Sequence, residues 1–464
     1  MDGFIGCSGS QWAQVQMEGV ELGAVRRNRR ATRLLTSMAK DPSGSIPRQA
    51  GIRKDIKAAY RFFDSDGVDF DALTSPHHRR TVQSAGKHAL TLMIQDTTEF
   101  GWPAASLTRG LGLVGYGHTA GKGLLLHNTL AVVPGEHAEV LGLAHQCLWA
   151  RQRVKVGETR AERRARPSEA DRWAAAIVAI GAPPSGQRFV HVGDRESDQF
   201  DVSDACRQVG CNFAIRGNGA AARRSAYAGH GPLEKHSALI DLAKALPGIS
   251  KRTLEVRARP GRAARTAKLT ISAGPVTLLP PCPQRGERAA PVQAWVTRAW
   301  KARPRKGAEP LEWVLITDVP TTDAAGAERI IAWYEHRWVI EKYHKCLKTG
   351  CQVEARQLEE AERLKALIGM LGLVAVRLLQ LKQLGRARPD QAATKSVEVE
   401  YVKTLAKYQN KPVEHYSNRE FWRQVTTLGG FMARKGDGDP GWQTLWHGWQ
   451  KLQLLTAGLQ LASG

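Results

Sequence analysis

Two kinds of hydrophobic pattern run along the chain. Short, continuous apolar runs predict buried strands, and apolar residues that recur every three or four positions predict helices. The predicted strands cover residues 89–100, 123–133, 138–149, 188–193, 211–216 and 311–317. The predicted helices cover residues 31–39, 48–63, 169–181, 198–209, about 322–350, about 354–385 and about 440–462. A Pro-Gly-Glu-His turn at 134–137 separates two of the strands and predicts a hairpin.

This order predicts an α/β fold with a ribonuclease-H-like mixed sheet. Three antiparallel strands come first, and parallel strands joined by helical crossovers follow, so helices cover both faces of the sheet. The assignment to that fold rests on analogy. We expect a helical domain at 1–75, a core built on the sheet at 76–385 and a C-terminal helical domain at 386–464, whose first part, to about 440, is looser. Residues 217–310 are rich in Gly, Pro and Arg and predict a basic β insertion within the core.

The charge balance restricts the class of partner. Lys and Arg number 67 against 44 acidic residues, which gives a net charge of +23 and a pI near 10.0. Such an excess favours a polyanion, either nucleic acid or an anionic membrane face, although a soluble basic protein without such a partner also fits. The longest apolar stretch, Ala366 to Val376, is too short to cross a bilayer, and the N-terminus lacks the pattern of a secretory signal. The seven cysteines contain no CxxC pair, so we expect reduced thiols in a cytoplasmic protein.

Two aspartates follow apolar strands. Asp96 stands at the end of the run 89–96, and Asp194 stands directly after 188–193. Strand ends of α/β sheets expose polar side chains to a crevice, and a carboxylate there favours a hard divalent cation. Each aspartate taken singly is equally compatible with a turn residue that caps the next helix.

A third acidic residue lies within the predicted helix 322–350. With about 100° per residue, Tyr334, Arg337, Glu341, Lys345 and Lys348 share a stripe roughly 80° wide. The helix would therefore present one carboxylate among cations and a phenol, while its other side packs on the sheet. An ordinary solvated face with i,i+4 ion pairs is the alternative.

These residue types suit phosphoryl transfer. Two Mg²⁺ ions about 3.5–4 Å apart can activate an attacking hydroxyl and stabilise a leaving 3′ oxygen. Mg²⁺ keeps several waters and needs few carboxylates, so Asp96, Asp194 and Glu341 would be enough, and Mn²⁺ could substitute. The cations on the stripe would hold the phosphate oxygens.

The spacing Y-x2-R-x3-E-x6-K resembles the signature of the IS-four-type bacterial DDE transposases, particularly those of the Tn-five type. The likeness extends over nearly the whole chain, in this order: RRNRRATRLL, AAYRFF, IQDTTEF, GLAHQ, DRESD, PLEWVLIT, YEHRWVIEKYHKCLKTG, VAVRLLQLK, LGGFM and WQTLWHGW. The resemblance implies cut-and-paste DNA transposition through a hairpin intermediate, within a homodimer that holds two transposon ends. It also implies that domain 1–75 binds DNA, that the core 76–385 is catalytic and that domain 386–464 forms the dimer.

The resemblance also assigns roles. It implies that Asp96, Asp194 and Glu341 hold the metal ions and that Tyr334, Arg337, Lys345, Lys348 and Arg216 contact DNA phosphates. It implies that Trp313 stacks on a flipped base and that Trp338 helps to hold the distorted strand, although an apolar strand such as 311–317 also fits a core tryptophan at 313. At position 218 the chain has Asn where the family pattern has Lys, so contacts in that groove do not carry over.

Contacts with the transposon ends and between subunits are predicted less specifically. Candidate end-binding residues are Arg26, Arg27, Arg29, Arg30, Tyr60 and Arg61, although the arginine cluster is also compatible with a solvated helix face. The tail helix presents an apolar face that would either form a dimer or pack on its own chain, and it consists of Trp442, Leu445, Trp446, Trp449, Leu452 and Leu455. The competing functions are a metal-dependent DNA nuclease with the same core and a DNA-binding derivative without catalysis.

Overall fold

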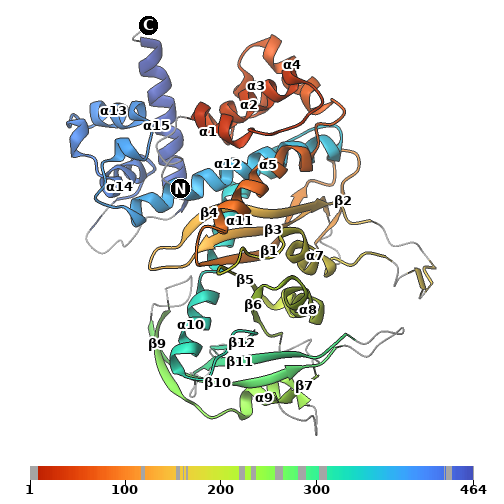
Figure 1. Ribbon diagram of the computed structural model, residues 1–464. Coiled ribbons are helices and arrows are strands. Elements are labelled where there is room, and N and C mark those ends of the chain that lie inside the picture. Colours follow the sequence, from red (N-terminus) through yellow and green to blue (C-terminus); the bar gives the residue numbers. More distant parts are fainter. Residues whose placement is uncertain are drawn as a thin grey trace.

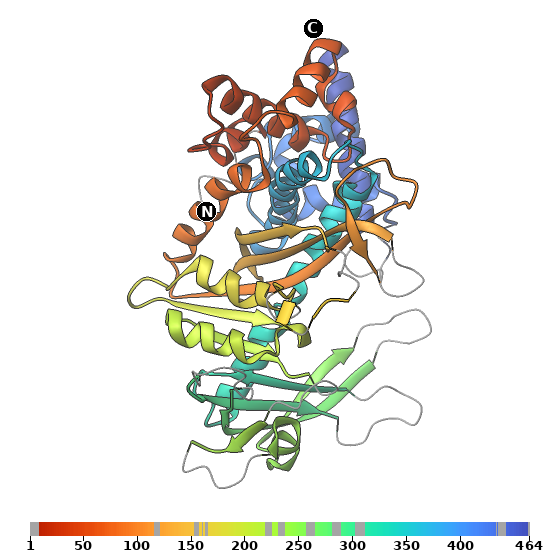
Figure 2. The ribbon, with the colours of Figure 1, turned by 90° about the vertical axis from the view of Figure 1, so that its right-hand side faces the viewer.

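A mixed β-sheet runs through the middle of the molecule in the computed structural model, with helical regions from both ends of the chain on one side of it (Figures 1 and 2). The structure describes residues 9–462 apart from 116–120, 153–156, 160, 163–165, 219–224, 231–236, 257–264, 281–288, 302–310, 433 and 435–441. Within these residues, twelve strands belong to one sheet. The sheet also extends into the lower part of the molecule as drawn, where the segment after residue 217 forms its own group of strands.

The core of the sheet confirms the predicted fold class. β1 (Leu90–Trp102) pairs antiparallel with β3 (Gly121–Val133), which pairs antiparallel with β4 (Glu139–Trp149) across the predicted hairpin. On its other edge β1 pairs parallel with β5 (Arg188–Gly193), and β5 pairs parallel with β6 (Asn212–Arg216). Three antiparallel strands followed by two parallel ones is the expected ribonuclease-H-like arrangement.

Helices cover both faces of this core, because alternate residues of each strand point to opposite faces. On one face, Met93, Phe189 and Phe213 pack with α7 (Asp171–Ile180) and α8 (Phe200–Val209). On the other face, Leu92 and Val190 belong to the larger core, which also contains residues of α10 (Ala324–Glu335), α11 (Trp338–Lys345) and α12 (Ala361–Ala387). A strand buried on both faces is continuously apolar, which is why the strands appear as uninterrupted runs in the sequence.

The segment after β6 extends the core sheet. β12 (Glu312–Thr317) was expected to resume the core, and it does pair with β6, but in the antiparallel direction. Its other edge pairs with β11 (Val292–Trp300), and β11 pairs in turn with β10 (Arg265–Leu278). The remaining elements of this segment are β7 (Ser225–Ala228), β8 (Ser237–Ala238), α9 (Leu239–Ala245) and β9 (Ser250–Val256).

The N-terminal region is helical, as predicted, but its helix boundaries differ. α1 (Gly9–Gln16), α2 (Val25–Lys40), α3 (Ile46–Ala50) and α4 (Arg53–Phe63) precede α5 (Phe70–Ala85). The arginines at 26–30 were expected before a helix that starts at 31, and they instead lie inside α2. The single helix predicted for 48–63 is wrong, because Gly51 adopts φ 75° and ends α3. A residue without a Cβ reaches that backbone conformation without strain.

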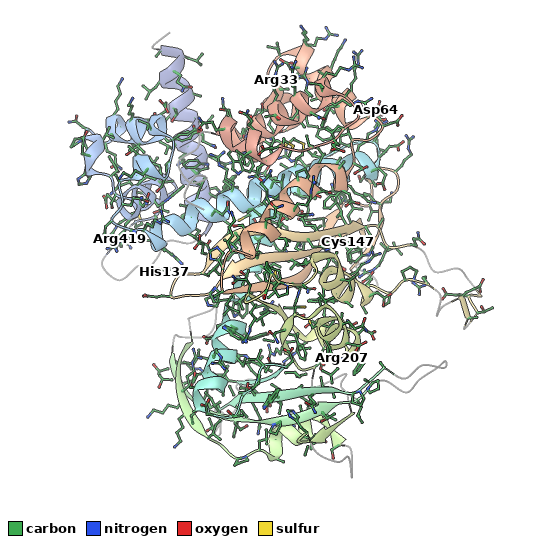
Figure 3. All side chains as sticks on the ribbon, viewed as in Figure 1. Arg33, Asp64, His137, Cys147, Arg207 and Arg419 are labelled. Carbon is green, nitrogen blue, oxygen red and sulfur yellow. The ribbon has the colours of Figure 1, made fainter. Side chains whose placement is uncertain are left out.

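The long helix α12 joins the three regions. It packs against α2, α4 and α5 at one side, against β4 and against α14 (Asn418–Leu428) of the C-terminal region. Near its start Arg363 forms an ion pair with Asp64. Asp64 directly follows α4 and is labelled in Figure 3. The stretch Ala361–Gln383 is long and apolar enough to cross a membrane. However, 78% of its most apolar 18-residue part is buried inside the protein, which is also typical of a core helix.

The C-terminal region is more helical than predicted. Residues 386–440 were expected to be looser, yet α13 (Val399–Tyr408) and α14 lie within them. Each helix is short and amphipathic, so its apolar stripe finds a partner only through tertiary packing. The last helix, α15 (Trp442–Ala462), packs against both.

Candidate active site

Strand register brings Asp96 and Asp194 to the same level of the sheet. Ile94 on β1 pairs with Val192 on β5, and each aspartate follows two residues later, Asp96 within β1 and Asp194 directly after the end of β5. Gly193 pairs with Ile215 on β6, so Arg216 follows at the level of Asp194. The carboxyl ends of parallel strands form the crevice in which α/β proteins bind ligands.

The environment of Asp96 differs from the predicted strand end. β1 continues to Trp102, and Asp96 lies in its middle, opposite Asn128 of β3. The prediction that Asp96 ends its strand is therefore wrong. What ends after Ile94 is the parallel pairing with β5, because β1 continues to pair with β3 alone.

Two other carboxylates influence the carboxylate of Asp96. Burial, the charge of Asp194 and the weaker effect of Glu341 together raise the pKa of Asp96 to about 7. The Arg337 guanidinium and the backbone N–H of Thr97 act in the opposite direction. Negative charge therefore accumulates around Asp96, whose side chain is only 15% exposed to solvent.

Asp194 combines two features that the sequence left as alternatives. Its Oδ1 accepts a hydrogen bond of 2.9 Å from the backbone N–H of Glu196, so it caps the short 3₁₀ turn Arg195–Ser197. Its backbone carbonyl accepts a bond of 2.6 Å from the Ser197 hydroxyl. The cap holds one carboxylate oxygen in place, and the charge of the same carboxylate reaches Asp96.

The predicted helix 322–350 bends where the acidic residue approaches the sheet. α10 begins where Asp323 caps the N–H of Gly326 and ends at Glu335, and α11 starts at Trp338. Between them the backbone bonds span three residues, as in Arg337 N–H to Tyr334 C=O at 3.0 Å. A 3₁₀-type turn rotates successive side chains by about 120° per residue, compared with about 100° in an α-helix.

The bend overturns part of the predicted stripe. Tyr334 was expected on the exposed polar face, but it is 4% exposed and belongs to the core. Arg337 is also buried, at 8%, whereas the side chain of Glu341 is 41% exposed. A straight helix would have kept these three residues on one open stripe.

Arg337 bridges two of the acidic residues. Its Nη2 donates to Oε1 of Glu341 at 2.6 Å, and its Nη1 lies 3.5 Å from Oδ2 of Asp96. The guanidinium also lies over the rings of Trp338, at 4.9 Å, and Tyr334, at 5.9 Å. Its Nε is buried and has no hydrogen-bond partner among the described residues. Most buried donors are hydrogen-bonded, so this Nε is available to an acceptor such as a phosphate oxygen.

Two lysines continue from α11. Lys345 is exposed, and Lys348 lies in a π-helical turn, Cys346–Gly350, with its Nζ 5.9 Å from the ring centre of Phe100 on β1. π-turns are rare and are often found at functional sites. The turn places Lys348 beside the strand that carries Asp96.

The predicted stacking tryptophans lie beside this group. Trp313 on β12 is half-buried, and its ring centre is 6.4 Å from that of Tyr334. Trp338 is 46% exposed, which is unusual for so large an apolar side chain. Arg216 is half-buried and donates to the carbonyl of Glu312 at 3.2 Å.

The residues present suit a divalent cation, although they do not form a complete ligand set. Within the described residues, no three His, Cys, Asp or Glu side chains gather closely enough to hold one ion together. The oxygen donors and the accumulated negative charge at Asp96 are nevertheless what Mg²⁺ prefers, and Mg²⁺ requires few protein ligands. In this structure Arg337 is the cation that lies nearest both Asp96 and Glu341.

Sequence reasoning missed a second polar group behind Asp96. Nδ1 of His344 lies 3.9 Å from Oδ2 of Asp96, and its Nε2 lies 3.0 Å from Nδ2 of Asn128. Burial and, to a smaller extent, the charges of Lys348 and Arg337 lower the pKa of His344 to about 3. The signal was available in the sequence, because His127 and Asn128 interrupt the apolar run of β3.

The candidate end-binding arginines divide into two groups. Arg26, Arg29 and Arg61 are exposed. Arg27 donates to the carbonyls of Leu22 and Asp66, both at 3.0 Å, and Arg30 pairs with Asp55 at 3.0 Å. Tyr60 is 42% exposed on α4.

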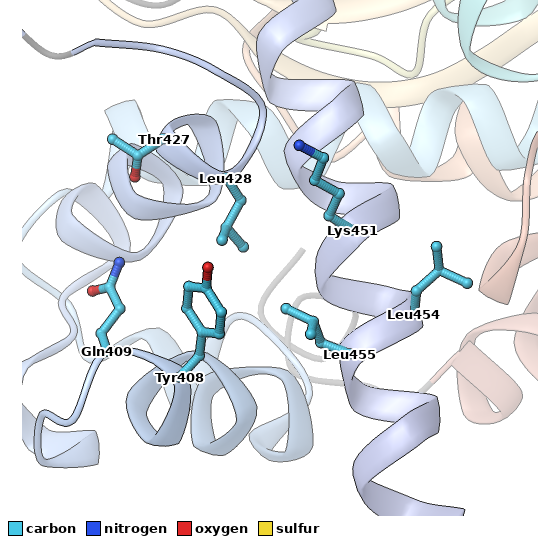
Figure 4. A pocket seen from close by; sticks show the side chains of 7 residues that line it. All are labelled: Tyr408, Gln409, Thr427, Leu428, Lys451, Leu454 and Leu455. Atoms are coloured by element: carbon cyan, nitrogen blue, oxygen red, sulfur yellow. The ribbon is translucent and has the colours of Figure 1, made fainter.

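The face of α15 that was a candidate dimer surface is mostly covered by its own chain. Leu445, Trp446, Trp449 and Leu452 are buried, and Leu455 is half-buried. The side chain of Trp442 lies outside the described residues. Another face is open instead: Leu454 is 74% exposed and Leu461 is 85% exposed. Leu454 and Leu455 line a pocket of about 550 Å³ (Figure 4). Its other walls include Tyr408 at the end of α13 and Leu428 at the end of α14.

Comparison with known protein families matches three models to this chain. A transposase DNA-binding model matches residues 9–68, and a transposase DDE domain model matches residues 190–377. A Tn5 transposase dimerisation domain model matches residues 373–464. The DDE match contains Asp194 and Glu341, whereas Asp96 lies before it.

Proposed function

Because this chain belongs to the Tn5-type, IS4-family DDE transposases, we propose that it carries out cut-and-paste DNA transposition by metal-dependent phosphoryl transfer. The steps are nicking at the transposon end, hairpin formation, hairpin resolution and joining of the 3′ end to target DNA. The observation that carries the proposal is the geometry around Asp96, which lies at the level of Asp194 on the sheet and is linked to Glu341 through the Arg337 guanidinium.

We assign Asp96, Asp194 and Glu341 as the residues that would hold two Mg²⁺ ions, with Mn²⁺ as a substitute. When bound, the ions supply the activation of the attacking hydroxyl and the stabilisation of the leaving 3′ oxygen. The β1–β5 register supports this assignment, since it sets two of the carboxylates side by side.

The basic residues around the carboxylates would hold the DNA backbone. Arg337 has a buried Nε without a described partner, which suits a phosphate oxygen, and a guanidinium binds phosphate through several donors. Lys345 and Lys348 follow Arg337 along the same helical segment. Arg216, the last residue of β6, lies at the level of Asp194. Tyr334 is buried against Arg337, so we assign it to orienting the guanidinium as well as to approaching a phosphate.

Trp313 and Trp338 would hold unstacked bases during hairpin formation. Extrusion of a base costs a few kcal/mol, and a flat apolar side chain compensates for part of it. The 46% exposure of Trp338 leaves its ring accessible next to Arg337.

The terminal regions would bind the transposon ends and assemble the dimer. The match at 9–68 supports DNA binding by the N-terminal helices, where Arg26, Arg29 and Arg61 are exposed. The match at 373–464 supports dimer formation, and we place the contact on the open face of α15 around Leu454. The partners are then terminal inverted repeats, target DNA and a second copy of the chain.

The test is cleavage of DNA that carries the inverted repeats flanking the gene, in the presence of Mg²⁺. Wild-type protein should yield hairpin-ended excised DNA. Asp96→Ala, Asp194→Ala and Glu341→Ala should each abolish cleavage while end binding in a gel-shift assay survives. Glu362→Gln is the matched control, since Glu362 is an exposed carboxylate paired with Lys365 on α12. Retained cleavage in all three alanine variants would contradict the assignment.

The same experiment separates the two competing functions. A simple metal-dependent nuclease would cleave but never join the 3′ end to target DNA, even with the correct end sequence. A DNA-binding derivative would bind the ends and show no cleavage in Mg²⁺ or Mn²⁺.

A further inference from the structure

A chain of buried polar side chains leads from Asp96 into the protein. His344 on α11 contacts Asn128 on β3, and Oδ1 of Asn128 accepts a bond of 2.7 Å from Nε2 of Gln146 on β4. Gln146 also donates to the Tyr343 hydroxyl at 3.2 Å, and its Oε1 lies 3.4 Å from a ring nitrogen of His78. Four of these side chains are buried between α11, α5 and the β3–β4 hairpin, and His78 on α5 is half-buried.

The bonds at Asn128 determine which nitrogen of His344 carries its proton. The Leu126 carbonyl can only accept, and it lies 3.3 Å from Nδ2 of Asn128, so Nδ2 is the amide nitrogen. The same Nδ2 is 3.0 Å from Nε2 of His344 and therefore donates to it. A ring nitrogen that accepts carries no hydrogen, so a neutral His344 carries its proton on Nδ1.

That proton faces a catalytic candidate. Nδ1 of His344 is 3.9 Å from Oδ2 of Asp96, while Oδ1 of Asp96 accepts the Thr97 N–H at 2.9 Å. At 3.9 Å the pair faces each other without a hydrogen bond, and an approach of about 1 Å would form one. Nη1 of Arg337 lies 3.5 Å from the same Oδ2. This oxygen therefore faces two N–H groups, one from Arg337 and one from His344.

We propose that His344 is a positioning residue, which donates from Nδ1 to Asp96 and fixes the orientation of that carboxylate for a divalent cation, and that Asn128 and Gln146 hold His344 in the required tautomer. The inference rests on the proposed function, since it assigns Asp96 to a metal ion. Groups behind a ligand commonly orient it in this way, and their loss typically costs about 10–100-fold in metal affinity or activity.

A purely structural role does not account for the arrangement. Four polar side chains in this interior cost desolvation, and apolar residues of similar shape would fill the same space at comparable or lower cost. The network also has a direction, because each bond from Leu126 onward determines the next donor and ends with an N–H that faces Asp96.

Two amide variants of His344 separate positioning from simple space filling. The amide nitrogen of Asn corresponds in position to Nδ1 of His, whereas that of Gln corresponds to Nε2. His344→Asn keeps a donor toward Asp96 but loses Asn128, and His344→Gln keeps a partner for Asn128 but loses the donor. We expect Mn²⁺ binding, measured by calorimetry on the DNA-free protein, to weaken about 10–100-fold in His344→Gln and His344→Ala. In His344→Asn it should stay within about threefold of the wild-type value.

The tautomer can be measured without metal or DNA. In long-range ¹H–¹⁵N spectra of the metal-free protein with labelled histidine, the His344 signals are those that vanish in His344→Asn. We expect a neutral ring with hydrogen on Nδ1 at pH 7. Asn128→Asp, which presents only acceptors to Nε2, should move the hydrogen to Nε2 and weaken Mn²⁺ binding as His344→Gln does.

The matched control is His77, an equally buried histidine on α5 whose ring nitrogens contact Gln16 at 2.7 Å and the Leu143 N–H at 2.9 Å. His77→Gln should lower the melting temperature without changing Mn²⁺ binding. The inference is overturned if His344→Gln binds Mn²⁺ like the wild type while His344→Asn does not, or if His344 carries its hydrogen on Nε2. Failure of DNA cleavage by the wild-type protein would sink the proposed function alone, since neither readout here uses DNA.

Discussion

Replacing Asp96 with Asn should stabilise the metal-free protein at alkaline pH while it abolishes cleavage. Burial and the charges of Asp194 and Glu341 raise the pKa of Asp96 from 3.8 to about 7. The folded chain therefore holds this proton more tightly than the unfolded chain does. It follows that the wild-type protein loses stability as the pH rises from about 4 to about 7, and the loss is complete above the folded pKa.

The size of the effect follows from the shift. A difference of about three pKa units at about 1.36 kcal/mol per unit corresponds to about 4 kcal/mol as an upper value. About one unit of the shift already acts at pH 5, so the change between pH 5 and pH 8 is about 2–3 kcal/mol. Asn resembles the protonated acid in shape and carries no charge, so the Asp96→Asn protein should not show this loss.

The assay is urea unfolding followed by tryptophan fluorescence, in EDTA, from pH 5 to pH 8. The midpoint of Asp96→Asn should exceed that of the wild type by an amount that grows with pH. Addition of Mg²⁺ at a hundredfold excess over its dissociation constant should return about 2.7 kcal/mol to the wild type and much less to the variant. A midpoint difference that is constant with pH would refute the reasoning that burial and two acidic neighbours raise this pKa.

Three further predictions concern other parts of the chain. Trp313→Ala should leave the first nick intact and lower hairpin formation about tenfold or more, since stacking on an aromatic ring contributes about 1–3 kcal/mol per base; the ratio of hairpin to nicked DNA on a denaturing gel tests this. Leu454→Glu should abolish dimer formation in analytical ultracentrifugation without lowering the melting temperature, because this side chain is 74% exposed, and a persistent dimer would place the interface elsewhere. Arg356→Met should destabilise the packing of the N-terminal helices by about 3 kcal/mol, because the buried guanidinium donates to the carbonyls of Pro42, Gly44 and Cys351. Faster proteolysis near residue 68, where the DNA-binding match ends, would confirm it, and an unchanged rate of proteolysis would contradict it.

The helix bend at 336–337 shows where sequence reasoning reached its limit. Spacing by three and four residues drew attention to Arg337, Glu341 and Lys348, but it assumed one straight helix. The turn of three-residue bonds rotated α11 relative to α10 and buried Tyr334. Nothing in the local sequence specifies that turn, because it results from packing on the sheet.

The same limit applies to α15 and to Asp96. The apolar period of α15 predicted a face that must be covered, and it left open whether a partner or the chain itself covers it. Packing on α13 and α14, two helices that the sequence reasoning missed, covers it within the chain. Asp96 was correctly linked to a strand, but its place in the middle of β1 depends on β3, which continues to pair after β5 has ended.

By itself the sequence determined the strands of the core sheet and their order, the fold class and the transposase family, because periodicity and motif spacing are local properties of the chain. Only the tertiary structure decided which side chains touch: the level of Asp96 with Asp194, the guanidinium of Arg337 between two carboxylates, and the polar chain from Asp96 through His344 and Asn128. These contacts join residues that are tens to hundreds of positions apart. Strand register and helix packing set them, and both depend on the free energy of the whole folded core rather than on any one segment.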